Sequence, residues 1–265
     1  DLHSPRRRQR QMCIRDRIPN VPEPDLSVCG PLARSAKDLE IALDVMAGPM
    51  ERRSKGWQLN LAECKKTSLK DFKVAIWSND ELAPVSKEIA QRCEEVGNKL
   101  NSVGTTVSFT AKPEHDFMKA EINYQLLLQS VMQSGLPEDE YQKIEELASS
   151  LDKNDLSVDA ILAKGTVLSH RNWLRQNYAR EQIKISWSKF FEEWDVLICP
   201  QLATTAIEHD HKKISERTVM VDNQEQRYFQ QIFWPGLAVN AHLPSTVFPT
   251  AVSYTHLRAH ETCLD

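Results

Sequence analysis

The chain has 265 residues, of which 41% are hydrophobic and 26% charged, and its formal net charge is −4. This length allows one large domain or two small ones, and no apolar stretch approaches the roughly 18 residues that a membrane-spanning helix requires. Six cysteines with no Cys-x-x-Cys pair form neither a disulfide framework nor a zinc-ribbon spacing. Four of them lie between residues 18 and 250 in no framework, which favours a reducing, cytoplasmic environment.

The two ends of the chain differ from its middle in charge and composition. Residues 1–17 carry a net charge of +4, residues 251–265 carry −1, and residues 18–250 therefore carry −7. The strings PRRRQRQMCIRDR and SYTHLRAHET resemble translated adapter sequence from short-read libraries. We therefore predict adapter-like tails at 1–17 and 251–265 on either side of a domain portion at 18–250. An acidic body is a poor partner for nucleic acid or an anionic membrane, and we expect neither as a partner.

The start of this body predicts an extended loop followed by one short helix. Three prolines between residues 18 and 25 favour extended backbone. Ser35, with Asp38 three residues later, forms a capping-box pattern that begins a helix, and Gly48-Pro49 ends it.

A β-α-β unit is predicted next. Residues 72–77 (FKVAIW) are typical of a strand, and 105–110 (TTVSFT) form a second, β-branched one. Between them, residues 86–103 carry an apolar stripe at helical spacing and begin with Ser86 as a cap. Such a short β-α-β segment favours parallel strands with a right-handed crossover.

The remainder of the body predicts mostly helices. Residues 114–193 are helical in pattern throughout, with separate helices expected at 122–132, 137–151 and 166–193. Residues 195–200 (DVLICP) predict a buried strand that ends at a proline, 201–223 a polar stretch, and 224–233 a further helix. The fold class is therefore α/β, with helices packed on a mixed β-sheet.

Glycine usage excludes several familiar catalytic loops. The chain has only eight glycines, and no two of them lie within five residues of each other. Phosphate-binding loops of the GxGxxG or GxxxxGK[ST] kind are therefore absent, as is a glycine- and serine-rich nucleophile loop.

The remaining candidate constellations all have a plainer interpretation. The run Glu208–His211 holds two histidines, but no third ligand has a recognisable spacing, so we favour a solvated loop and predict no metal. Two Ser-x-x-Lys patterns, at 150–153 and 186–189, lack companion motifs. Cys199 follows a strand, where sites often lie, but a buried apolar thiol is favoured over a reactive one.

Several motifs in order along the chain resemble the amidase signature family. The segment DLSVCGPLARS at 25–35 is similar to the stretch just downstream of that family's catalytic core. WDVLICP at 194–200, WPGLA at 234–238 and LPSTV at 243–247 resemble later motifs of the family. The resemblance covers nearly all of residues 18–250.

The resemblance implies a partial amidase-signature fold from a parent that hydrolyses the C–N bond of linear carboxamides. Members of the family use a Ser–cis-Ser–Lys triad and an oxyanion-binding glycine-rich loop. All of these lie upstream of the GPLARS segment, and no residue of this chain matches them. We therefore expect a C-terminal fragment that contains no catalytic residue and is inactive by itself.

The resemblance also implies which residues meet the substrate. The loop at 200–206 and the helix end at 231–234 would wall the acyl pocket, so Leu202 and Trp234 are the predicted substrate-binding residues. Ordinary core or surface packing is the alternative for both. A small amide is the expected ligand, no cofactor or metal is implied, and a homodimer is left open.

Two other functions stay open at this point. The segment could be a non-enzymatic, helix-rich interaction domain on a hydrolase-derived scaffold, or the arginine-rich tail could bind nucleic acid, against the −7 charge of the body. A partial sheet also predicts that the inner faces of the strands at 72–77 and 195–199 meet water, with marginal stability as the consequence.

Overall fold

The computed structural model describes residues 25–28, 30–49, 51–212 and 216–250. The adapter-like tails expected at 1–17 and 251–265, and most of the proline-rich loop, lie outside these ranges. The chain falls into two units, residues 1–65 and 66–265. Every buried residue among those described belongs to the second unit, which therefore holds the core.

The first unit contains the helix that the capping pattern predicts. Helix α2 (Ala36–Met46) begins after Ser35, whose side chain accepts a hydrogen bond from the backbone N–H of Asp38 at 3.1 Å. This bond satisfies one of the free N–H groups of the first turn. A short helix, α3 (Glu51–Ser54), follows. No residue of α2 is buried, so packing within this unit does not stabilise it.

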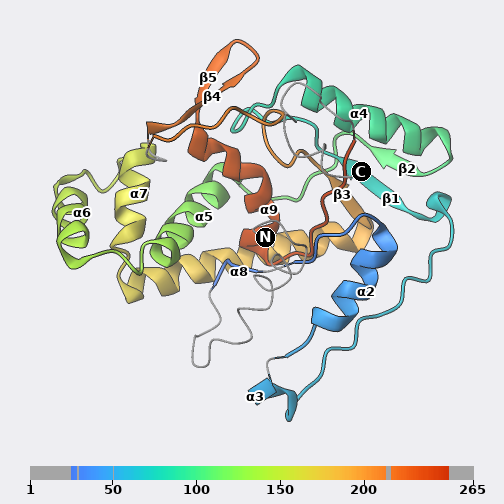
Figure 1. The fold of residues 1–265 in the computed structure, drawn as a ribbon, viewed down its shortest axis with the longest axis horizontal. Helices are drawn as coiled ribbons and strands as arrows, with labels where there is room; N and C mark the ends of the chain where they lie inside the picture. The colour runs from blue at the N-terminus through green and yellow to red at the C-terminus, as the bar shows by residue number, and fades with distance from the viewer. Residues whose placement is uncertain (1–24, 29, 50, 213–215, 251–265) are drawn as a thin grey trace, which may run out of the picture. The chain divides into compact units, whose positions relative to one another are not determined.

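A three-stranded parallel sheet organises the second unit (Figure 1). The strand order is β2-β1-β3, and the strands are β1 (Lys73–Ile76), β2 (Thr106–Ser108) and β3 (Val196–Ile198). Helix α4 (Lys87–Ser102), capped by Ser86, joins β1 to β2, so the predicted parallel β-α-β unit is confirmed. The α/β class is confirmed as well. This sheet is parallel throughout, however, and the antiparallel pairing described here lies in a separate hairpin rather than in a mixed sheet.

The central strand β1 is covered on both faces. Val74 and Ile76 pack with Cys93 of α4, and the residue between them, Ala75, packs with Trp187 from a different helix. Burial on both faces explains the unbroken apolar run of this strand. The expectation that the inner face at 72–77 meets water is therefore wrong. Only the edge strand β3 is partly open, with Val196 exposed.

A group of helices follows the sheet. These are α5 (Phe117–Met132), α6 (Glu138–Ser150), α7 (Val158–Thr166) and α8 (His170–Glu193). The single long helix expected from residue 166 is wrong, because α7 ends there and α8 has its own cap, Ser169. Where α5 and α7 pack together, Gly165 leaves so little room that an added Cβ would lie 2.8 Å from the Cβ of Gln129.

The segment after β3 departs most from the sequence-based expectation. Instead of a polar stretch and a helix at 224–233, it forms a hairpin, a 3₁₀ helix and an α-helix: β4 (Thr218–Val221), β5 (Gln224–Arg227), η4 (Tyr228–Ile232) and α9 (Phe233–Ala241). The reason is the turn between the strands, where Asp222 adopts a φ of 52°. Asp and Asn tolerate this left-handed backbone, which a tight hairpin turn requires. Val219 and Val221 then alternate into the core.

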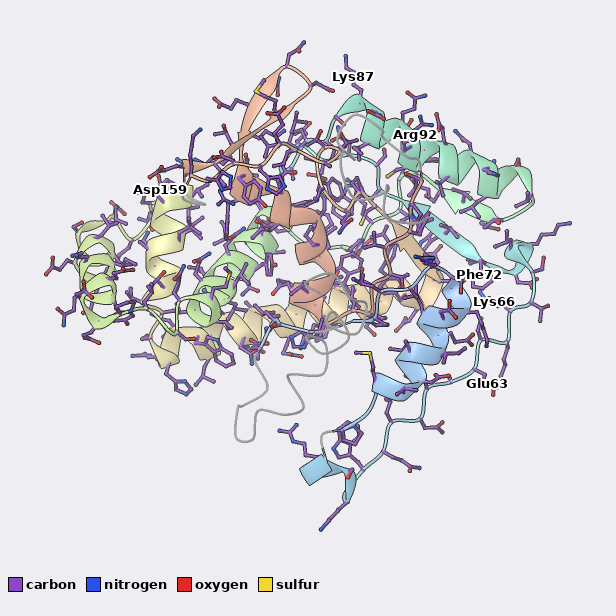
Figure 2. The ribbon with its side chains drawn as sticks, viewed as in Figure 1. Glu63, Lys66, Phe72, Lys87, Arg92 and Asp159 are labelled. Atoms are coloured by element: carbon purple, nitrogen blue, oxygen red, sulfur yellow. The ribbon has the colours of Figure 1, made fainter. Side chains whose placement is uncertain are left out.

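An ion pair ties the entry of the second unit to the sheet. The ammonium of Lys66 bonds the carboxylate of Asp195, just before β3, and also lies 5.1 Å from the ring centroid of Phe72 (Figure 2). The backbone N–H of Lys73 donates to the same carboxylate at 2.8 Å. These contacts, the Lys66 hydrogen bond first, hold the pKa of Asp195 below its usual range.

Replacing Asp195 by asparagine is expected to lower the free energy of unfolding by up to about 1 kcal/mol at neutral pH, because the pair is partly solvent-exposed. Asparagine can still accept the Lys73 N–H, so the substitution isolates the ion pair. A carboxylate whose pKa is depressed by folding stabilises the protein above its unfolded pKa, and this stabilisation is lost as pH falls through the folded pKa. Urea unfolding should therefore show a difference at pH 7 that shrinks below about pH 4 and in high salt. A difference that is constant with pH would contradict the assignment.

Candidate functional site

The candidate site lies at the carboxyl edge of the parallel sheet, where α/β proteins usually bind ligands. Three segments meet there: residues 77–85 after β1, residues 199–206 after β3, and residues 231–234 before and at the start of α9. Their contact is a single buried cluster that includes Trp77, Ala83, Ala203, Phe233 and Trp234. The three segments are therefore held together by one apolar core.

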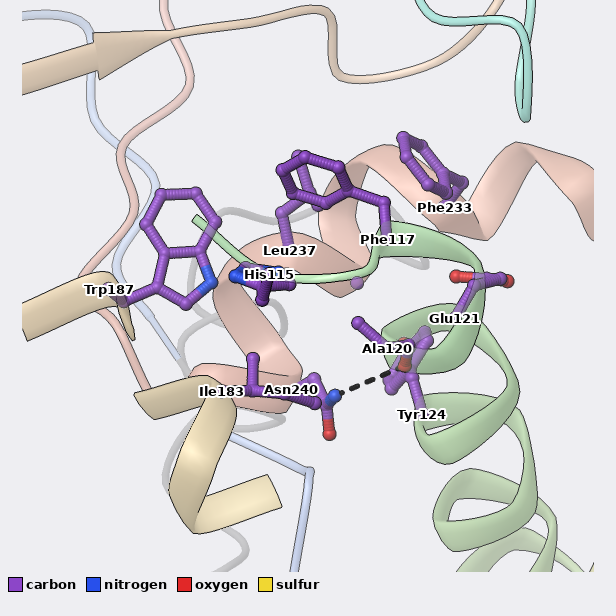
Figure 3. A pocket seen from close by; sticks show the side chains of 11 residues that line it. His115, Phe117, Ala120, Glu121, Tyr124, Ile183, Trp187, Phe233, Leu237 and Asn240 are labelled. Carbon is purple, nitrogen blue, oxygen red and sulfur yellow. Dashed lines mark hydrogen bonds between the residues drawn. The ribbon is translucent and has the colours of Figure 1, made fainter. Parts of the chain in front are cut away.

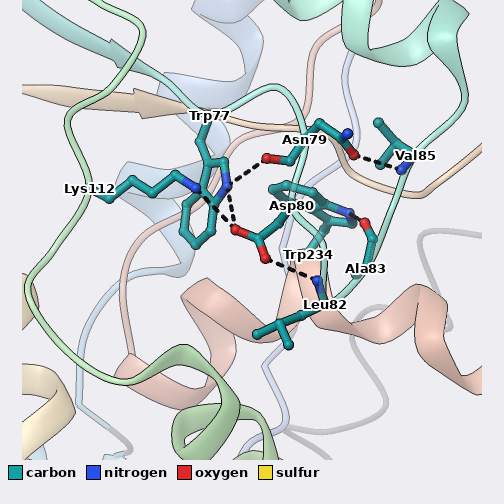
Figure 4. A network of polar contacts seen from close by, with 8 residues as sticks. All are labelled: Trp77, Asn79, Asp80, Leu82, Ala83, Val85, Lys112 and Trp234. Carbon is teal, nitrogen blue, oxygen red and sulfur yellow. Dashed lines mark hydrogen bonds and ion pairs between the residues drawn. The ribbon is translucent and has the colours of Figure 1, made fainter.

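A polar network orders the first of these segments (Figure 4). The indole N–H of Trp77 lies within hydrogen-bonding distance of both the backbone oxygen of Asn79, at 3.1 Å, and the carboxylate of Asp80, at 3.2 Å. Lys112 pairs with the same Asp80 oxygen at 3.0 Å, and its ammonium lies 4.3 Å from the Trp77 ring centroid. The other Asp80 oxygen accepts the backbone N–H of Leu82 at 3.1 Å. The turn after β1 is thus fixed by charge-assisted hydrogen bonds and a cation–π contact.

The two predicted substrate-binding residues have different environments. The side chain of Trp234 is only 1% exposed, packs edge-on against Trp77, and donates its indole N–H to the backbone oxygen of Ala83 at 3.1 Å. Leu202 is 44% exposed and adjoins Ala203, which packs in the same cluster as Trp234. The structure therefore brings the two residues to one region, with Leu202 presenting surface to solvent and Trp234 inside the core.

Ala203 fixes the loop that carries Leu202. Its N–H donates to Oε1 of Gln231 at 2.9 Å, and its carbonyl accepts the N–H of Ser86 at 2.7 Å. The loop after β3 is consequently tied both to the segment before α9 and to the N-cap of α4. The sequence places Gln231 only at a pocket-wall helix end, and no local pattern indicates its bond to Ala203.

The other sequence candidates show no arrangement for nucleophilic catalysis. Ser186 lies 3.0 Å from Nδ1 of His115 rather than on Lys189, and Ser150 donates to the Leu147 carbonyl at 2.7 Å. Burial lowers the pKa of His115, and burial raises the pKa of the Cys199 thiol to about 12. A thiol with so high a pKa is not a ready nucleophile.

The histidine-containing loop forms no metal-binding cluster. The rings of His209 and His211 have centroids 6.4 Å apart. Within residues 25–28, 30–49, 51–212 and 216–250, no group of three or more His, Cys, Asp or Glu side chains has the arrangement that a metal requires.

Behind the site lies a small cavity between α5, α8 and α9 (Figure 3). Its volume is about 20 Å³, and His115, Glu121, Tyr124, Trp187 and Asn240 contribute to its lining. Burial raises the pKa of Glu121 and raises that of Tyr124 to about 12. A space of this size holds one water molecule and no organic amide.

A larger and more open cleft lies between the turn after β1 and the β4–β5 hairpin. Its volume is about 370 Å³, and its lining is mainly polar: Asn79, Lys87, Asp222, Asn223, Gln224 and Gln226, with Pro84, Val85 and Val221. Asp222 accepts the backbone N–H of Lys87 at 3.2 Å, so a carboxylate of the chain itself already occupies the N-terminus of α4. Gln226 donates to the Pro84 carbonyl at 3.0 Å.

Comparison with known protein families gives a match over almost the whole chain. The Amidase family matches residues 16–254. The chain belongs to the amidase family. Among the described residues of this amidase chain, no helix is both long and apolar enough to cross a membrane.

Individual relatives match the amidase chain over part of their length. A glutamyl-tRNA(Gln) amidotransferase protein of Saccharolobus solfataricus is 36% identical over 86 residues, which are 32% of this chain and 18% of the relative. A bacterial aryl acylamidase of the amidase signature family has a TM-score of 0.50 at 14% identity, covering 83% of this chain and 47% of that one. Fatty acid amide hydrolase has a TM-score of 0.47 at 18% identity, covering 67% and 31%. The chain thus spans less than half the length of each of these proteins.

Proposed function

We propose that this chain forms the substrate-pocket side of an amidase that hydrolyses small carboxamides, and that it does not hydrolyse them by itself. The observation that carries the proposal is the Amidase family match over residues 16–254. Two of the relatives, the amidotransferase and the aryl acylamidase, are themselves named for amide chemistry.

The absence of activity follows from the residues that the family's chemistry requires. A Ser–cis-Ser–Lys triad needs a nucleophilic serine beside a glycine-rich oxyanion-binding loop. With eight glycines, no two within five residues, the sequence contains no such loop. The segment at 25–35 corresponds to the family's stretch just after the triad.

The pocket part of the proposal rests on the carboxyl edge of the sheet. Leu202 provides the exposed apolar surface that an acyl chain can cover, and Trp234 supports the same region from within the core. Hydrogen bonds from Ala203 to Gln231 and from Ser86 to Ala203 hold the loop in place. A preorganised loop binds ligand with a smaller loss of conformational entropy.

The first test combines an activity assay with a binding assay on the whole 265-residue chain. We expect no hydrolysis of p-nitroacetanilide and no labelling by a fluorophosphonate serine probe. We also expect saturable binding of pentanamide by calorimetry. Hydrolysis would contradict the proposed inactivity. Failure to bind pentanamide would contradict the proposed pocket and favour a non-enzymatic interaction domain.

A matched pair of surface variants localises the pocket. Leu202→Asp is expected to weaken pentanamide binding by about tenfold or more, which corresponds to about 1.4 kcal/mol, because a charge replaces apolar contact surface. Leu174→Asp is the control, since Leu174 on α8 is 50% exposed, close to the 44% of Leu202. Equal effects of the two substitutions would count against Leu202 as a pocket residue.

A further inference from the structure

Gln231 is a buried polar side chain with one satisfied and one unsatisfied group. It lies in η4 and is 6% exposed. Its Oε1 accepts the N–H of Ala203 at 2.9 Å. Its Nε2 is buried and has no hydrogen-bond partner within the described part of the chain.

The orientation of this amide follows from its one hydrogen bond. A backbone N–H can only donate, so the Gln231 atom that faces Ala203 has to be the oxygen. An amide flip would place two donors against each other and leave the Ala203 N–H without an acceptor. The group of Gln231 that lacks a partner is therefore an N–H₂ donor rather than an acceptor.

An unpaired buried donor is costly, so its presence asks for an explanation. A core side chain selected only to hold Ala203 would not need a second polar group. Ala203 itself packs with Trp77 and Trp234 in the apolar cluster at the carboxyl edge of the sheet. In such surroundings a hydrogen bond to an incoming acceptor is stronger than the same bond in water.

We propose that Gln231 is a specificity-determining residue of the acyl pocket, where its Nε2 donates to a second oxygen on the acyl part of the substrate. The substrate class is then carboxamides whose acyl chain carries a keto, ester or further amide oxygen beyond the amide to be cleaved. This inference rests on the proposed function, since it names the substrates that the pocket selects.

Binding in this way also involves the loop at 200–206. Nε2 is covered in the unliganded chain, so the acyl chain has to displace part of its cover. Leu202, the neighbour of the Ala203 that Gln231 holds, is already exposed. Occupancy of the pocket should therefore change the environment of both the Gln231 side-chain amide and the Ala203 N–H.

The decisive experiment compares two ligands that differ by one acceptor. Pentanamide and levulinamide have the same chain length, and levulinamide adds a single keto oxygen. Calorimetry on the whole chain should show that levulinamide binds about tenfold or more tightly, because only it can satisfy the donor. Gln231→Leu should bind the two amides equally. Gln91→Leu, on the exposed face of α4, should retain the preference.

A second measurement needs no variant and remains valid if Gln231→Leu fails to fold. In the wild-type chain labelled with ¹⁵N-glutamine, levulinamide should shift the Gln231 side-chain N–H₂ signal, and pentanamide should leave it nearly unchanged. Equal binding of both amides with no shift of this signal would overturn the inference and leave the proposed function standing. Binding of neither amide would count against both.

Discussion

Replacing Trp234 by alanine is expected to lower the free energy of unfolding by about 3–5 kcal/mol, among the largest effects of any single substitution in this chain. The indole is 1% exposed and contacts the rings of Trp77 and Phe233, with centroids 5.5 and 5.2 Å away. Alanine leaves a cavity between these rings and removes the hydrogen bond to the Ala83 carbonyl. Urea unfolding followed by far-ultraviolet circular dichroism measures the change.

Two further substitutions separate the contributions to this effect. Trp234→Phe keeps an aromatic ring but leaves the Ala83 carbonyl without its donor, and should cost about 1–3 kcal/mol. Trp57→Ala removes a tryptophan that is 51% exposed and should change stability by less than about 0.5 kcal/mol. If Trp234→Ala were no more harmful than Trp57→Ala, the aromatic cluster would not be the core of this region.

A methyl group at Gly236 is the second substitution with a large expected effect. A Cβ at this position of α9 would lie 2.5 Å from Cε1 and 2.7 Å from Cδ1 of Tyr124. Tyr124 is itself buried, so its ring has little room to move. Overpacking of this kind costs about 1–3 kcal/mol, and the higher helix propensity of alanine returns only about 1 kcal/mol. Gly236→Ala is therefore expected to destabilise the protein in thermal and urea unfolding.

The control for this prediction is a glycine in open space. Gly135 has no atom within 4 Å of an added Cβ and no positive φ, so Gly135→Ala should be neutral or slightly stabilising. In a double-mutant cycle, Tyr124→Leu should recover part of the loss caused by Gly236→Ala, because the smaller side chain makes room for the methyl group. Strictly additive effects of the two substitutions would argue against the close contact.

The elements predicted correctly are those whose signals are local. Ser35 and Ser86 mark the starts of α2 and α4 because a hydroxyl in that position accepts a backbone N–H of the first turn. Gly104, with a φ of 94°, follows α4 at the position where the sequence ends that helix. The apolar run that forms β1 is also evident without the structure. In each case the deciding residues lie within a few positions of the element that they define.

The prediction for the region after β3 is wrong because its signals are weak and its partners are distant. The hairpin depends on an Asp-Asn turn and on valines that alternate over only four residues, and this pattern also fits a polar loop. Residues 224–227 can form a helix or a strand, and pairing with β4 decides for the strand. Helix α9 then begins at Phe233, where aromatic packing on Trp77 orders the chain.

The candidate site divides in the same way. Motif resemblance indicates the region of Leu202 and Trp234, but nothing in the sequence shows that one is exposed and the other buried. The Lys112–Asp80 pair and the bond from Ala203 to Gln231 join residues 32 and 28 positions apart. No local pattern encodes such pairs, because they form only when the sheet brings their loops together.

By itself the sequence determined the α/β class, the parallel β-α-β unit, the likeness to amidases and the lack of a glycine-rich catalytic loop. The tertiary structure alone decided that β1 is covered on both faces, that a hairpin precedes α9, and that Gln231 keeps an unpaired donor in the core. The physical reason is the range of the interactions. Caps, turns and periodic burial are set by near neighbours, whereas burial, register and hydrogen-bond satisfaction depend on residues that only folding brings together.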